Sequence, residues 1–266
     1  MSKYRIWIDA GHGGNAPGAV YKDVQEKEIV LDVSMRLGSL LSTDFNVIYS
    51  RSEDSSLSID ERWKAANLAN MDYFISIHAN AGGGTGVETF YYKDNTERSR
   101  RSEVFARTLN DSYAEIMGLR NRGVKPDTQT AVGSIGVLRK TNMPAILVEL
   151  AFIDSPPQNP DVNILQNKRA EMAQALAKGI YKYLGMEPSL PASQAESLIR
   201  VQLGAFKQRA NADALQLRLR ELGYDTFIKE DSALYRVQLG AFRERANAEA
   251  LAAKLKAQGF ETYITT

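Results

Sequence analysis

The first 185 residues alternate between short apolar runs and longer segments of helical periodicity, and this alternation constrains the fold more than any other feature. Runs of strand length are expected near residues 4–9, 45–50, 72–78, 85–92 and 144–150, and helices near 26–43, 58–70, 97–117 and 165–184. The second helix opens on Ser58 and Glu61, the pattern of a capping box. Alternation of this kind predicts an α/β fold with a mainly parallel sheet flanked by helices.

The C-terminal part of the chain is a duplication. The heptapeptide that begins at Arg200 recurs 36 residues later at Arg236, and 17 of 29 positions are identical between 200–228 and 236–264. Each copy reads as strand, helix, Gly turn and strand, and one copy alone is too small to bury its apolar face. The repeats 200–235 and 236–266 therefore predict one small α+β domain of βαββαβ order over residues 198–266.

Residues 186–197 join these two regions. The segment holds two prolines among small and polar residues and has no hydrophobic periodicity, which is typical of a linker. We therefore expect a catalytic domain over 1–185, a linker over 186–197, and the duplicated domain over 198–266.

The composition excludes several classes of function. The net charge is +1, from 33 Lys and Arg against 32 Asp and Glu, which gives no indication of nucleic acid binding. No apolar run reaches the ~20 residues of a membrane span. The N-terminus enters a strand at once and lacks a signal-peptide pattern, so we expect synthesis in the cytoplasm without export by a signal peptide. We also expect the chain to be a monomer. Cysteine is absent, and a metal site would have to use His, Asp or Glu.

The two histidines of the chain stand at matched positions. His12 follows the first apolar run and His78 follows the third, while a later run delivers Glu149 in the same way. Residues at the carboxyl ends of parallel strands converge on one crevice. A single histidine would more often be an ordinary loop or core residue. Two at matched positions, together with an acid in an apolar run, favour a metal site.

A third ligand is expected from the start of the first helix. At 100° per residue, Glu26 lies on the apolar face of that helix with Ile29 and Val33, whereas Glu28 shares the opposite side with Asp32. An acid placed there only for the helix dipole would serve as well pointing outward. Glu26 is therefore the better candidate ligand.

Glu149 has the setting of a catalytic base. A carboxylate in an apolar run costs several kcal/mol unless it is paired, metal-bound or protonated, and such surroundings raise its pKa. The structural alternative is a buried ion pair with Arg139. Asp9 is a candidate for holding His12 from behind, because metal-bound imidazoles usually donate their other N–H to a carboxylate. Asn80 and Arg139 are candidates for orienting a substrate.

Four segments resemble, in order, the motifs of zinc-dependent N-acetylmuramoyl-L-alanine amidases: Asp9–Gly14, Glu26–Leu31, Ser76–Asn80 and Pro144–Ile153. The resemblance implies that His12, Glu26 and His78 hold one Zn²⁺ per chain and that Glu149 is catalytic. It also implies the substrate, peptidoglycan, and the bond, the amide between the lactyl group of N-acetylmuramic acid and L-alanine. Many relatives carry Asp where this chain has Glu28, a change that an outward side chain should tolerate.

The duplicated tail is similar to a SPOR domain, a module that binds peptidoglycan glycan strands stripped of stem peptides. Gln202, Phe206, Gln238 and Phe242 are the candidate exposed contacts for the glycan, although the two phenylalanines could equally be core residues. With no signal peptide expected, the chain resembles the sporulation-linked amidases that are made in the mother cell and help to lyse its wall.

Two alternative functions from other classes of protein remain open. The same ligands would support a zinc peptidase that cleaves within the stem peptide. A non-catalytic wall-binding protein with a residual metal site is the other, and the full set of His12, Glu26, His78 and Glu149 argues against it.

Overall fold

A computed structural model describes residues 3–130, 133–156, 158–188, 199–222, 224, 226–231, 234–242 and 245–265. The chain divides into two compact units, Met1–Ser189 and Leu190–Thr266. Most of the predicted linker, 186–197, lies outside the described residues. No helix in the described part of the chain is both long enough and apolar enough to cross a membrane.

A six-stranded sheet forms the centre of the first unit. Its order is β4-β1-β5-β8-β6-β7, with strands β1 (Arg5–Ala10), β4 (Asn46–Tyr49), β5 (Tyr73–Asn80), β6 (Val87–Tyr91), β7 (Asn121–Pro126) and β8 (Ala145–Phe152). All neighbours run parallel except β6 and β8, which confirms the predicted, mainly parallel α/β sheet. Strand β7 was not predicted, because Asn-Arg-Gly-Val-Lys-Pro shows no apolar alternation and the strand lies at an edge of the sheet.

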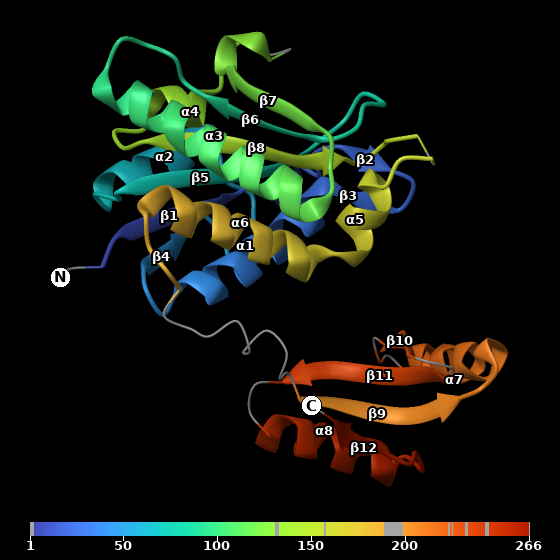
Figure 1. The fold of residues 1–266 in the computed structure, drawn as a ribbon. Helices are drawn as coiled ribbons and strands as arrows, with labels where there is room; N and C mark the ends of the chain where they lie inside the picture. The colour runs from blue at the N-terminus through green and yellow to red at the C-terminus, as the bar shows by residue number, and fades with distance from the viewer. Residues whose placement is uncertain are drawn as a thin grey trace. The chain divides into compact units, whose positions relative to one another are not determined.

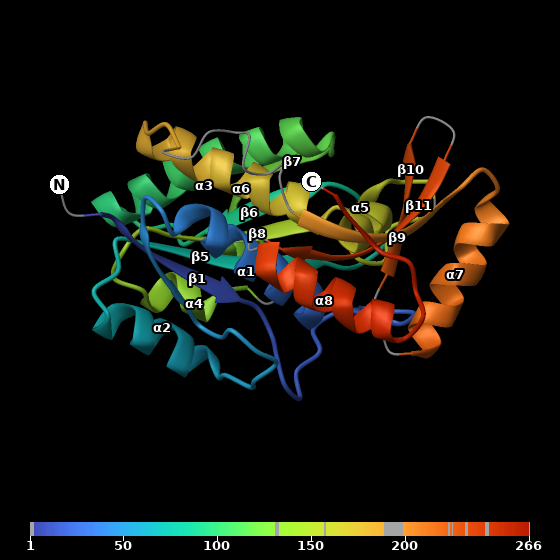
Figure 2. The ribbon, with the colours of Figure 1, turned by 90° about the horizontal axis from the view of Figure 1, so that it is seen from below.

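Helices cover both faces of this sheet (Figures 1 and 2). One face packs against α1 (Glu26–Leu41), α3 (Glu97–Met117), α5 (Asp161–Asn167) and α6 (Arg169–Leu184), and the other against α2 (Ile59–Leu68) and α4 (Gly136–Lys140). The alternation along β1 explains both layers, because Ile6 and Ile8 join the first core and Trp7 joins the second. A short hairpin, β2 (Val20–Tyr21) and β3 (Val24–Gln25), precedes α1, and a 3₁₀ turn, η1 (Asp127–Gln129), follows β7.

Two helical features differ from the prediction. The helix expected over 165–184 is two helices, because Lys168 leaves the helical region with φ −121° and ψ 37°. Helix α4 has only five residues, too few to show a period in the sequence. The capping box at Ser58 and Glu61 is confirmed.

The second unit has the predicted order βαββαβ. It contains β9 (Ile199–Phe206), α7 (Arg209–Glu221), β10 (Thr226–Asp231), β11 (Leu234–Phe242), α8 (Arg245–Ala257) and β12 (Tyr263–Thr265), in an antiparallel sheet of order β10-β11-β9-β12. Its core joins strand residues such as Val201, Val237 and Leu239 to helix residues such as Leu219 and Leu255.

The expected exposure of four residues in this unit is wrong. Gln202 and Gln238 are buried, with 8% and 5% of their surface exposed. Phe206 and Phe242 are partly buried and pack against the core. A Cβ placed at Gly204 would lie 2.6 Å from the Phe206 ring, so the glycine makes room for that ring on the core side. The phenylalanines therefore follow the core alternative.

Candidate active site

Three predicted ligands meet at the carboxyl edge of the sheet. His12 lies in the loop after β1, Glu26 is the first residue of α1, and His78 lies two residues before the end of β5. Glu26 Oε2 is 3.1 Å from His12 Nε2, and Glu26 Oε1 is 2.9 Å from His78 Nδ1. One ligand atom from each of the three residues lies within 4.8 Å of the others. Two imidazoles and one carboxylate are a donor set that zinc takes in catalytic sites.

Glu26 is placed and ionised by its surroundings. The backbone N–H of Ala19 donates to Oε2 at 2.8 Å, and that of Ala79 donates to Oε1 at 2.9 Å. Burial by itself raises the pKa of Glu26, but the hydrogen bonds and charges of the two imidazoles outweigh it and hold the pKa well below its usual range. Glu26 is 3% exposed whereas Glu28 is exposed, so the predicted inward direction of Glu26 is confirmed.

His78 carries the complementary charge in the metal-free protein. Burial lowers the pKa of its imidazole, but the hydrogen bond and charge of Glu26 outweigh that effect and raise the pKa to about 9. A metal ligand must be a neutral imidazole, so a metal held by His78 would displace this proton.

Glycines leave the space that the ligand side chains fill. A Cβ at Gly11 would lie 2.4 Å from His78 Cε1, and a Cβ at Gly18 would lie 2.5 Å from Glu26 Oε2. His12 itself has φ 56°, a left-handed conformation that is uncommon for a residue with a side chain. The tight packing around the three donors is consistent with a built ligand site, and these residues fit a metal ion.

Two buried arginines, which the sequence reasoning missed, hold the loop that carries His12. Arg51 donates to the carbonyl oxygens of Ala10 and Gly11 at 3.1 and 2.8 Å. Arg62 donates to the carbonyl oxygen of His12 at 2.6 Å. In the sequence, Arg51 stands just after a predicted strand and Arg62 within a predicted helix, and neither position by itself indicates a contact with the His12 loop. Their hydrogen bonds offset the left-handed backbone of the loop.

The predicted contact between Asp9 and the His12 imidazole is not formed. Asp9 Oδ1 accepts from Arg62 at 2.7 Å and Oδ2 accepts from Ser76 at 2.7 Å, so both oxygens are occupied elsewhere. Asp9 follows Trp7 in alternation, and its side chain therefore faces α2 rather than the loop. It supports His12 only through Arg62 and the backbone.

Glu149 lies beside this cluster on β8. It is the Cα partner of His78 on β5 and of Glu88 on β6, so the three side chains share one face of the sheet. Glu149 Oε2 is buried without a hydrogen-bond partner among the described residues. Burial is the largest effect on the pKa of Glu149 and outweighs the lowering by the His78 charge; with smaller raising effects from the charges of Glu26 and Glu88, the pKa rises to about 7. The structural alternative is not formed, because Arg139 is exposed on α4 and makes no ion pair with Glu149 in the described part of the chain.

Asn80, proposed from sequence to orient a substrate, is committed to another side chain. Its Nδ2 donates to Glu88 Oε1 at 2.6 Å, and its Oδ1 accepts from the N–H of Ala81 at 2.9 Å. Asn80 therefore positions Glu88 next to the site.

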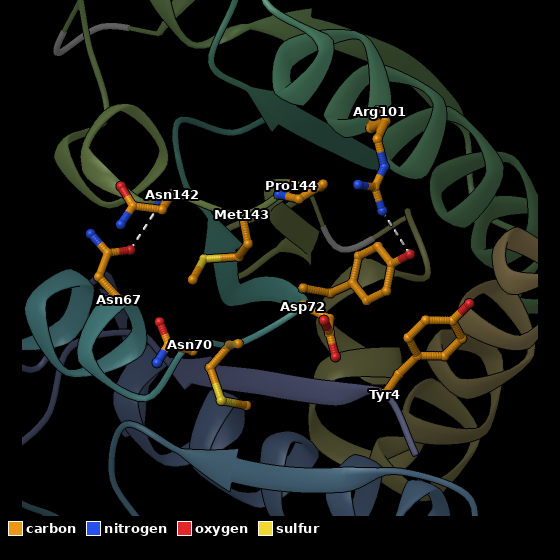
Figure 3. A pocket seen from close by; sticks show the side chains of 10 residues that line it. Tyr4, Asn67, Asn70, Asp72, Arg101, Asn142, Met143 and Pro144 are labelled. Carbon is orange, nitrogen blue, oxygen red and sulfur yellow. Dashed lines mark hydrogen bonds between the residues drawn. The ribbon is translucent and has the colours of Figure 1, made fainter. Parts of the chain in front are cut away.

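A separate hollow of about 320 Å³ lies at the opposite, amino edge of the sheet (Figure 3). Its polar groups are largely paired with one another. Tyr73 Oη accepts from Arg101 at 3.0 Å, and Asn67 Oδ1 accepts from the N–H of Asn142 at 2.8 Å. Asp72, the carboxylate among the lining residues, accepts from the backbone N–H of Arg5 at 2.7 Å. With these groups paired and no metal-ligand set among the lining residues, the hollow is no rival for the active site.

The fold and the site together define a class of protein. A mainly parallel sheet with a His-Glu-His group at its carboxyl edge, and an unpaired buried glutamate beside that group, is the arrangement of a metal-dependent hydrolase. The chain belongs to the N-acetylmuramoyl-L-alanine amidase family, which matches residues 6–182, and a SPOR domain matches residues 195–266. It is therefore a peptidoglycan hydrolase of the amidase type.

Individual relatives agree with this assignment. The chain is 35% identical, over 84% of both sequences, to a sporulation-specific N-acetylmuramoyl-L-alanine amidase of Bacillus subtilis (strain 168). It is equally similar, over the same shares, to the N-acetylmuramoyl-L-alanine amidase CwlM of Bacillus licheniformis.

Solved structures show the same fold in the first unit. An N-acetylmuramoyl-L-alanine amidase from Clostridium difficile 630 matches with a TM-score of 0.63 and 31% identity, over 70% of this chain and 98% of that one. The catalytic domain of CwlV, an amidase from Bacillus (Paenibacillus) polymyxa var. colistinus, matches with a TM-score of 0.61 and 30% identity, over 69% and 99%.

Proposed function

We propose that this amidase holds one Zn²⁺ on His12, Glu26 and His78 and uses Glu149 as its acid–base residue. The observation that carries the proposal is the convergence of two imidazoles and an ionised carboxylate within 4.8 Å, with Glu149 on the adjacent strand. A zinc ion bound there supplies a Lewis acid that polarises the scissile carbonyl and lowers the pKa of water toward 7.

Glu149 moves the protons of the reaction. Its unpaired Oε2 can accept a proton from the attacking water, and a pKa of about 7 suits a group that must be a base near neutral pH. The same carboxyl then gives this proton to the nitrogen of L-alanine as the amide C–N bond breaks. The products are the free lactyl carboxylate of the sugar and a stem peptide with a free N-terminal amine.

Metal removal tests this function directly. Peptidoglycan digested by the full chain should yield intact stem peptides that begin with free L-alanine, and this release should stop with a chelator and return with Zn²⁺. Mass spectrometry of the soluble peptides and of the glycan identifies the bond that is cut. Cuts within the peptide would instead favour the peptidase alternative, and wall binding without any release would favour the non-catalytic one.

The second unit is proposed to hold the enzyme on glycan strands that lack stem peptides. A row of four paired residues crosses its sheet in the order Tyr263, Gln202, Gln238, Phe227. Their neighbours along the strands point to the helix-covered core, so the row lies on the other face. Tyr263 and Phe227 are 56% and 43% exposed, and the buried Gln238 Oε1 lacks a hydrogen-bond partner among the described residues. Exposed rings beside amide groups suit a sugar polymer.

Removal of the two rings tests this surface. The double substitution Phe227→Ala and Tyr263→Ala should weaken binding to glycan strands, measured by pelleting, at least about tenfold. The reason is that burial of each ring against the sugar contributes ~1–2 kcal/mol to the free energy of binding. The hydrolysis of a small soluble substrate should not change. Leu217→Ala is the matched control, since Leu217 is 61% exposed on α7. Equal loss of binding in the control, or none in the double variant, would contradict the proposed face.

The two units have different proposed functions. We assign catalysis to residues 1–185, a tether to 186–197, and wall binding to 198–266, so that the second unit raises the local concentration of substrate for the first. The similarity to a sporulation-specific amidase supports action on the wall during sporulation. We propose that this action is lysis of the mother-cell wall and that the chain acts as a monomer.

A further inference from the structure

A polar row continues past Glu149 toward the far edge of the sheet. Glu149 is paired with His78 on one side and with Glu88 on the other. Neighbouring strands lie ~4.8 Å apart, so Glu88 stands roughly 5 Å from Glu149 on the side away from the metal ligands. The next strand beyond Glu88 is β7.

Two cations from β7 reach Glu88. Arg122 Nε donates to Glu88 Oε2 at 3.0 Å, and Lys125 Nζ donates to the same oxygen. Residues three apart on a regular strand point to opposite faces. Here β7 has one residue more than β6 between two paired positions, since Val87 pairs with Asn121 and Thr89 with Val124. This bulge turns both cations to one side, as bulges near active sites often do.

The two positive charges exceed the one negative charge of Glu88. One carboxylate faces two positive charges, which leaves a net charge of +1 at the cluster. Glu88 is 7% exposed, whereas Arg122 and Lys125 are 27% and 28% exposed, so the cations lie on the solvent side. Arg122 is also fixed over the ring of Phe152 at 4.8 Å. Within the described part of the chain, Arg122 Nη2 and two N–H groups of Lys125 have no hydrogen-bond partner.

We propose that Arg122 and Lys125, held by Glu88, bind a carboxylate of the stem peptide beside Glu149. The inference rests on the function proposed above. Once the lactyl group is in amide linkage, the disaccharide has no free carboxylate, so the anions of this substrate belong to the peptide. An extended peptide spans ~3.3–3.6 Å per residue, which places a carboxylate on its second residue ~7 Å from the scissile amide, within reach of this cluster. The subsite therefore sets the direction in which the peptide lies.

The structural alternative is an ion-pair network that only joins β6 to β7. Such a network would affect the hydrolysis of every substrate alike. A carboxylate subsite instead affects substrates according to the charge of the second peptide residue. The two hypotheses are therefore distinguished by the ratio of the rates for two substrates, and not by the rate for one substrate.

The test compares two soluble N-acetylmuramoyl peptides that differ only at the second residue, which carries a free carboxylate (isoglutamate) in one and a carboxamide (isoglutamine) in the other. With the zinc-loaded full chain, kcat/KM for the carboxylate should exceed that for the carboxamide about 10- to 100-fold, the worth of a hydrogen bond to a charged group. Lys125→Met should bring this ratio down to about threefold or less, and Lys125→Arg should restore most of it. Arg122→Met is the second variant, and circular dichroism checks that each is folded.

The matched control is Lys178→Met, an exposed lysine of α6, which should keep the wild-type ratio. A wild-type ratio near one would overturn the inference, and so would an unchanged ratio in both methionine variants. Equal cleavage of the two peptides contradicts the subsite alone. Cleavage of neither at the muramoyl bond contradicts the proposed function as well.

Discussion

Glu149→Gln is expected to lower the rate of amide cleavage by about 10²- to 10⁴-fold, the usual contribution of a general acid–base residue. Glutamine keeps the size of the side chain but can neither accept the proton of the attacking water nor return it to the leaving nitrogen. Because Glu149 Oε2 has no hydrogen-bond partner in the described part of the chain, the substitution breaks no hydrogen bond there. The rate is measured as free L-alanyl peptide released from a soluble muramoyl peptide.

The variant should still contain one zinc per chain and should still pellet with purified sacculi. Glu171→Gln, at an exposed position in the first turn of α6, is the matched control and should keep full activity. A Glu149→Gln protein within a few-fold of wild type would remove this residue from the proton transfers. Loss of zinc along with activity would point to a role in holding the metal instead.

Glu26→Gln is expected to weaken zinc binding by more than about 100-fold, since even loss of a partner behind a ligand commonly costs 10- to 100-fold. Among the described residues, Glu26 supplies the carboxylate that lies within ion-pair distance of both imidazoles, at 3.1 and 2.9 Å. A neutral amide cannot supply that charge and cannot accept from Ala19, Ala79 and a metal at once. Activity should fall in parallel with zinc content, which is measured by competition with a chromophoric chelator.

The neighbouring acid offers a close control for this experiment. Glu28→Gln removes the same charge from the same helical turn, where the side chain is exposed, so zinc content and rate should stay at wild-type values. Partial rescue of Glu26→Gln by excess Zn²⁺ would agree with a weakened site. Full zinc content in Glu26→Gln, or equal losses in both variants, would rule out Glu26 as a specific ligand.

Features that one local pattern decides are predicted correctly from the sequence. Helical periodicity alone placed Glu26 inward and Glu28 outward, because burial of the apolar stripe leaves the first turn little choice of orientation. The apolar runs before His12 and His78 located two strands of the sheet, and parallel strands bring their carboxyl ends to one edge. The duplicated tail predicted the βαββαβ order in the same way.

The role of a polar group is not predicted correctly where it depends on which partner the group bonds to. Asp9 was expected to hold the His12 imidazole and instead accepts from Arg62 and Ser76, both more than fifty residues away. Gln202 and Gln238 looked like exposed contacts, but the pairing of β9, β10, β11 and β12 buries them in the middle of a row. Alternation along a strand predicts on which face of the sheet a side chain lies, but it does not predict which residues cover that face.

For this chain, then, the sequence by itself determined the class of fold, the duplicated second unit, and which side chains gather at the carboxyl edge of the sheet, since these follow from periodicity and from the geometry of parallel strands. Only the tertiary structure decided how the His12 loop is held by Arg51 and Arg62, and that β7 lies beside β6. The second placement brings Arg122 and Lys125 to Glu88. Hydrogen bonds between charged groups depend on which segments pack together, and that choice is made by the whole core rather than by any one stretch of sequence.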